Sequence, residues 1–93
     1  MGLKALGHQQ ITVLTASTAL TVPVGTTLVL VTPTGTAVRW RDDGVAPTAS
    51  IGYPLAANTE LSYDGRDPTL LRFIEQSASS VLNVAYYGST LIN

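Results

Sequence analysis

The sequence predicts an all-β fold, a small antiparallel β-sandwich or jelly-roll-like barrel of about seven or eight strands. Threonine and valine are abundant, and both favour strands. Turn residues recur about every eight to twelve positions, a spacing typical of sandwiches and barrels. No segment longer than about ten residues keeps the period of an amphipathic helix.

Seven segments read as strands, and an eighth, short candidate lies around residues 50–53. The seven are Gln9–Thr15, Ala19–Val22, Thr27–Thr32, Thr36–Asp42, Glu60–Asp64, Leu70–Gln76 and Val81–Tyr87. The breaks between them have the expected chemistry. Pro33-Thr34-Gly35 favours a turn because proline presets φ and glycine accepts a positive φ. Asp43-Gly44 and Asp64-Gly65 are dipeptides that close hairpins.

Alternation along a strand predicts which side chains are buried, because successive residues point to opposite faces. Thr27–Thr32 is apolar at nearly every position, so this strand is expected to be central or covered by a neighbour. The expected core residues are Ile11, Val13, Leu28, Leu30, Val38, Trp40, Leu61, Phe73, Leu82 and Val84.

The 93 residues are expected to form one domain. We divide the chain into an N-terminal arm (residues 1–7), a β-sandwich domain (residues 8–88) and a C-terminal tail (residues 89–93). Both ends are apolar rather than charged, with Leu3 and Leu6 in the arm and Leu91 and Ile92 in the tail. Ends of this composition are candidates to dock on a partner.

Charged residues make up 12% of the chain, about half of the usual share. There is no cysteine, so neither a disulfide nor a cysteine-bound zinc can stabilise the fold. Burial against a partner is the remaining source of extra stability. A net charge of −1 disfavours nucleic-acid binding, which needs a concentrated basic face. The longest apolar run is too short to cross a bilayer, and we expect synthesis in a cytoplasm.

No catalytic constellation is present, so we expect no enzyme activity, no cofactor and no metal. His8 stands alone, and the glutamates Glu60 and Glu75 sit on expected strands, which disfavours a glycosidase pair. Asp42, Asp43, Asp64 and Asp67 leave a loop calcium site open as an alternative, although their spacing matches no EF-hand.

The sequence leaves more than one role open for two groups of residues, a charged group and the aromatic residues. Arg39, Arg41, Asp42 and Asp43 form a solvated face, an internal ion-pair network or an interface patch; the general scarcity of charge favours the interface. The aromatic residues pack in the core or build a sugar-stacking platform; core packing is favoured, because half of them fall on inward faces of the expected strands. They are Trp40, Tyr53, Tyr63, Tyr86 and Tyr87.

One ordered series of segments resembles small structural proteins of tailed bacteriophages. The series is Val38-Arg39-Trp40-Arg41-Asp42-Asp43-Gly44, Pro47-Thr48-Ala49-Ser50-Ile51-Gly52-Tyr53-Pro54-Leu55, Leu61-Ser62-Tyr63-Asp64-Gly65, Leu71-Arg72-Phe73-Ile74 and Leu82-Asn83-Val84-Ala85-Tyr86-Tyr87-Gly88. It spans roughly residues 8–88, and the arginine–tryptophan segment is its most specific part.

The resemblance implies a β-sandwich component of the virion, most simply a capsid decoration or cement protein. The implied partner is the major capsid protein, and the implied location is the capsid surface. A homo-oligomer is expected, with a trimer favoured because decoration proteins commonly occupy local threefold positions. The alternative is a carbohydrate- or receptor-binding module of a tail tip or fibre. The resemblance carries no catalytic residues with it.

Overall fold

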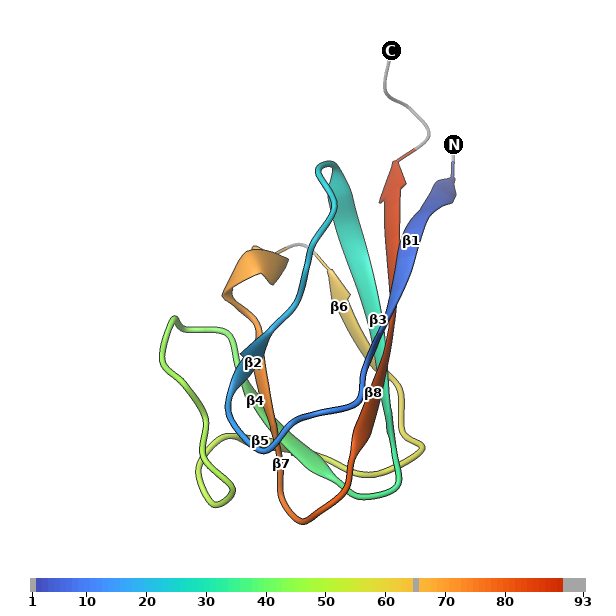
Figure 1. Ribbon diagram of the computed structural model, residues 1–93. Coiled ribbons are helices and arrows are strands. Elements are labelled where there is room, and N and C mark those ends of the chain that lie inside the picture. The colour runs from blue at the N-terminus through green and yellow to red at the C-terminus, as the bar shows by residue number, and fades with distance from the viewer. Residues whose placement is uncertain (1, 65, 90–93) are drawn as a thin grey trace.

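The computed structural model describes residues 2–64 and 66–89. These residues form two antiparallel four-stranded sheets packed face to face, as Figure 1 shows. The predicted all-β sandwich is confirmed. The helical structure in the described residues is one turn of 3₁₀ helix, η1 (Pro68–Leu70), capped by the Asp67 side chain.

The long sheet contains three strands of nine residues and one of four. Its order is β1 (Leu3–Ile11), β8 (Val81–Ser89), β3 (Thr26–Thr34) and β6 (Leu61–Asp64). The short sheet is built from strands of two to four residues. Its order is β2 (Thr18–Ala19), β7 (Arg72–Glu75), β4 (Val38–Arg41) and β5 (Tyr53–Leu55).

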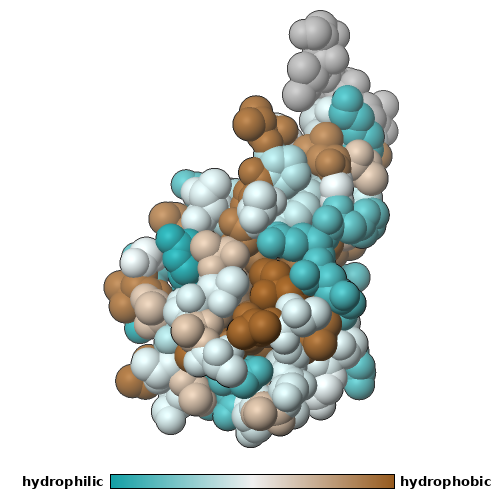
Figure 2. Space-filling view, viewed as in Figure 1, coloured by the Kyte–Doolittle hydropathy of each residue, from teal (hydrophilic) through white to brown (hydrophobic). Residues whose placement is uncertain are grey.

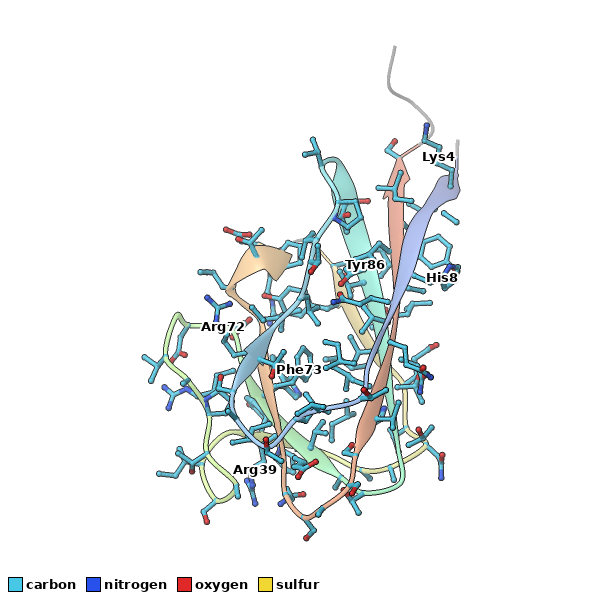
Figure 3. All side chains as sticks on the ribbon, in the orientation of Figure 1. Lys4, His8, Arg39, Arg72, Phe73 and Tyr86 are labelled. Carbon is cyan, nitrogen blue, oxygen red and sulfur yellow. The ribbon has the colours of Figure 1, made fainter. Side chains whose placement is uncertain are left out.

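The core fills the space between the two sheets. Phe73 and Tyr86, from opposite sheets, point into this space in Figure 3. The buried apolar side chains are Ile11, Leu14, Val29, Val31, Val38, Leu55, Tyr63, Leu71, Phe73, Leu82, Val84 and Tyr86. Trp40 and Leu61 are partly buried and pack at the margin of this cluster.

Three of the predicted core residues are elsewhere. Leu28 and Leu30 lie on the opposite face of β3 from the buried Val29 and Val31, so they point away from the short sheet. The strand is apolar at successive positions, and its alternation therefore did not identify the buried face. Val13 is 67% exposed because β1 ends at Ile11.

The first strand begins six residues earlier than its pattern predicts. Leu3 pairs with Ser89 and Ala5 with Tyr87, so most of the expected arm continues β1 alongside β8. Leu6 packs against the core cluster of its own chain. The start of β1, the end of β8 and the start of β3 lie together at one end of the long sheet (Figure 1).

Candidate functional site

Three aromatic rings meet where the two sheets come together at the end of β4. Trp40 is directly opposite Tyr53 in the β4–β5 pair. Their rings are stacked, with centroids 5.4 Å apart and planes 23° apart. Tyr63, from β6 of the long sheet, meets Trp40 edge-on at 6.1 Å. We call Trp40, Tyr53 and Tyr63 the aromatic cluster.

The members of the aromatic cluster differ in exposure. Tyr63 is 4% exposed, Trp40 is partly buried, and Tyr53 is 70% exposed. Core packing therefore accounts for Tyr63 and much of Trp40, but leaves most of the Tyr53 ring in solvent. Tyr86 belongs wholly to the core, at 2% exposed.

Asp42, which follows β4, is hydrogen-bonded to the aromatic cluster. The Tyr63 hydroxyl donates a 2.7 Å hydrogen bond to Asp42 Oδ2, and the Arg66 guanidinium lies 3.6 Å from the same oxygen. The guanidinium also sits 5.6 Å from the centre of the Tyr63 ring. Burial, and then the bond to the Asp42 carboxylate, raises the pKa of Tyr63 to about 12.

Arg41 and Asp43 form a two-bond ion pair on the surface. Arg41 Nε donates to Asp43 Oδ1 at 3.0 Å, and Nη2 donates to Oδ2. The Val45 backbone N–H also donates to Asp43. The hydrogen bond from Arg41 lowers the pKa of the Asp43 carboxyl, and the same bond raises the pKa of Arg41. Both side chains are thereby held in fixed positions beside the aromatic cluster.

Arg39 is bonded within its own chain. Its Nη1 donates to the Gly52 carbonyl at 2.8 Å and its Nε to the Ala49 carbonyl at 3.2 Å. These bonds hold the long β4–β5 connection against the sheet. In Figure 3, Arg39 lies on the opposite side of the short sheet from Phe73. Arg39 therefore stabilises the fold of its own chain, as an internal brace. Arg41 instead lies beside the aromatic cluster.

Open hollows lie on both sides of the Trp40–Tyr53 pair. One, of about 490 Å³, is lined by Trp40, Arg41, Asp42, Asp43, Gly52, Tyr53 and Pro54. The other, of about 310 Å³, is lined by Trp40, Tyr53, Leu61, Ser62, Tyr63, Asp64 and Arg66. Trp40 and Tyr53 line both hollows, so this pair of rings lies between them.

A third hollow, of about 460 Å³, lies on the long sheet. It includes side chains that point away from the short sheet, and Figure 3 shows His8 on that side of β1. We call this surface the outer face. It consists of His8 and Gln10 from β1, Asn83, Ala85 and Tyr87 from β8, Leu28, Leu30 and Thr32 from β3, and Ser62 and Asp64 from β6.

Sequence reasoning did not identify the outer face as a surface, because it placed Leu28 and Leu30 in the core. The run from Thr27 to Thr32, apolar on both faces, did predict a central or covered strand, and β3 is central between β8 and β6, but the run does not say which of its faces is left outside. In a protein of two thin layers, one of those faces has no second sheet to cover it.

The remaining predicted site residues are dispersed. Leu3 is 51% exposed at the start of β1, and Leu6 lies against the core. Leu91 and Ile92 lie outside the described residues. Among residues 2–64 and 66–89, no group of three or more histidines and carboxylates is placed to hold a metal ion.

No helix in the described part of the chain has the length and apolar character needed to span a membrane.

Comparison with known proteins gives no relative, since no protein-family model, curated protein or solved structure matches this chain.

Proposed function

We propose that the chain is a non-enzymatic structural protein of a tailed-bacteriophage virion, a capsid decoration or cement protein made in the host cytoplasm. It binds the major capsid protein through the outer face and stabilises the head. The resemblance of the arginine–tryptophan segment supports the virion assignment. The chemistry of the outer face supports docking, and it is the observation on which the proposal depends.

Two apolar rows cross the centre of the outer face. Leu28 is paired with Tyr87, and Leu30 with Ala85, between the neighbouring strands β3 and β8. All four side chains are partly exposed. The solvent face of an antiparallel sheet is ordinarily polar, so adjacent apolar pairs at its centre favour a covered surface.

Polar side chains surround the apolar rows. Gln10 donates a 3.2 Å hydrogen bond to Asn83 across the β1–β8 pair. Ser62 and Asp64 lie opposite Leu30 and Leu28 at the β6 side. An apolar centre with a polar rim is the usual composition of a protein–protein interface.

The end of the long sheet extends the same apolar character. Val24, in the turn before β3, is 100% exposed, and Leu3 is 51% exposed. Figure 2 shows hydrophobic surface at this end of the molecule. A partner that covers the outer face and this end would remove the apolar side chains of both regions from water. Burial of apolar surface stabilises a complex by about 25 cal/mol per Å².

The expected assembly is a trimer on the capsid surface, with the outer face of each copy toward the major capsid protein. The first test is a mass-spectrometric inventory of purified virions of the phage that encodes the chain. The second is retention on empty capsids assembled from its coat protein. Leu30→Asn should abolish retention while the free protein stays folded.

Val45→Asn is the matched control, because Val45 is an equally apolar, 51% exposed residue on the β4–β5 connection. It should be retained like the parent. Absence of the chain from virions, or equal retention of both variants, would refute the proposal. Sedimentation of the parent as a monomer, both free and on particles, would refute the trimer.

A further inference from the structure

We infer that the aromatic cluster is a second binding site, for a neutral oligosaccharide. It lies on the short sheet and at the junction with β6, apart from the apolar rows of the outer face. The smaller hollow shares Ser62 and Asp64 with the polar rim of the outer face, whereas the larger hollow, with Tyr53, shares no residue with it. The inference does not rest on the proposed capsid docking, and a protein bound through the outer face can present the larger hollow to solvent.

The Tyr53 ring supplies the stacking surface. It is 70% exposed, while the Trp40 ring behind it is held by the edge of Tyr63 at 6.1 Å. A ring supported in this way loses little conformational freedom when a ligand binds, which reduces the entropic cost of binding. The apolar C–H face of a pyranose is the ligand surface that fits an exposed aromatic plane.

Polar groups line the hollow beside the ring. Asp43 and Arg41 line the same hollow as Tyr53 and are locked to each other by two hydrogen bonds. Asp43 Oδ1 already accepts from Arg41 and from the Val45 N–H, but Oδ2 can accept a further hydrogen bond, and the guanidinium has N–H donors beyond the two it uses here. Hydroxyl groups, which both donate and accept, can use both kinds of partner.

The charges around the aromatic cluster favour a neutral ligand. Asp42, Asp43 and Asp64 line the two hollows together with Arg41 and Arg66. Arg41 is paired with Asp43, and Arg66 lies close to Asp42. An acidic sugar would therefore find both guanidinium groups already next to carboxylates.

The two hollows favour an oligosaccharide over a single sugar. They adjoin across Trp40 and Tyr53, which line both. A chain of several pyranose rings can place one ring on Tyr53 and extend its neighbours into the hollows. Polar side chains lie on either side, Asp43 in one hollow and Ser62 in the other.

The test uses the fluorescence of Trp40, which is the only tryptophan in the chain and lies in the proposed site. Cellohexaose and maltohexaose are titrated as neutral probes that differ in linkage, with sialyllactose as the acidic probe. A saturable fluorescence change is expected with at least one neutral hexasaccharide, and none with sialyllactose. Tyr53→Ala should weaken that binding at least about tenfold, and Tyr53→Phe should restore it.

Tyr87→Ala is the matched control, since it removes a tyrosine from the outer face. It should bind the hexasaccharide like the parent and lose retention on capsids, whereas Tyr53→Ala should do the reverse. Circular dichroism melting of each variant establishes that it is folded. A saturable change with neither neutral probe, stronger binding of sialyllactose, or equal binding by Tyr53→Ala overturns the inference, and none of these results bears on capsid retention.

Discussion

The Tyr63 hydroxyl donates a 2.7 Å hydrogen bond to the Asp42 carboxylate, and this bond joins the long sheet to the short sheet. Tyr63 comes from β6, and Asp42 follows the last residue of β4. The bond positions two elements of the candidate site, because Tyr63 supports Trp40 and Asp42 lines the adjoining hollow.

Tyr63→Phe should lower the free energy of unfolding by about 1–2 kcal/mol, since it removes a hydrogen bond to a charged acceptor but keeps the buried ring. In a domain of this size each kcal/mol shifts the melting temperature by about 4–8 °C. Thermal melting measures the loss. Tyr53→Phe removes an exposed hydroxyl and should melt like the parent; equal melting of both variants and the parent would contradict the role of the bond.

The two buried tyrosines make stability depend on alkaline pH. Burial is the main cause that raises the pKa of both Tyr63 and Tyr86 from 10.0 to about 12. The folded protein therefore keeps these phenols protonated where the unfolded chain has begun to lose the protons. Their stabilising contribution is complete below pH 10 and is lost as the pH rises from about 10 to 12.

The melting temperature should accordingly fall steeply across that pH range, together with the appearance of tyrosinate absorbance. The double variant Tyr63→Phe, Tyr86→Phe should show a smaller fall, because its two buried rings have no proton to lose. A parallel fall in parent and variant would assign the pH dependence to other groups.

The sequence predicted the sandwich because turn chemistry is local, but it could not assign every face. Val29 and Val31 are buried while Leu28 and Leu30 are on the outer face, and all four are equally apolar. Which face of β3 is buried depends on how this strand pairs with its two neighbours. The alternation of residues within one strand carries no information about that pairing.

The candidate site was predictable only in part. The sequence singled out Trp40, Arg41 and Asp43, which are close together in the chain. It did not predict the contact of Asp42 with Tyr63, because these residues are 21 positions apart and belong to different sheets. Nor did it separate Arg39 from Arg41, because alternation assigns both to one face and says nothing of the carbonyls near Arg39.

Leu82→Ala and Leu30→Ala should differ sharply in stability. Leu82 is fully buried between the sheets, so its truncation should cost about 2–5 kcal/mol. Leu30 is partly exposed on the outer face, and its truncation should cost about 1 kcal/mol or less. Chemical denaturation measures both. If Leu30→Ala lowered the free energy of unfolding as much as Leu82→Ala does, Leu30 would have to be assigned to the core.

Gly88→Ala should destabilise the end of the long sheet. A methyl group at Gly88 would lie 2.6 Å from the Gly25 carbonyl oxygen and 2.8 Å from Leu6 Cδ1. The turn before β3 must then move away from β8, at a cost of about 1–3 kcal/mol. Gly7→Ala in β1 is the control, because the nearest atom to its methyl group would be 3.9 Å away. Hydrogen exchange of the β8 amides should accelerate in the first variant alone.

Arg39→Ala and Arg41→Ala should separate a fold determinant from a surface residue. Arg39 bonds the Ala49 and Gly52 carbonyls, so its loss should free the β4–β5 connection and lower the free energy of unfolding by about 1–2 kcal/mol. Arg41 bonds the exposed Asp43, and its loss should leave the melting temperature close to that of the parent.

Limited proteolysis provides the second measurement for this pair. Arg39→Ala should be cleaved within residues 42–52 faster than the parent, and Arg41→Ala at the parent's rate. Arg41 lines the hollow beside the aromatic cluster and is not part of the outer face, so Arg41→Ala should be retained on capsids like the parent. A large drop in melting temperature for Arg41→Ala would contradict its assignment as a surface residue and make it a second internal brace.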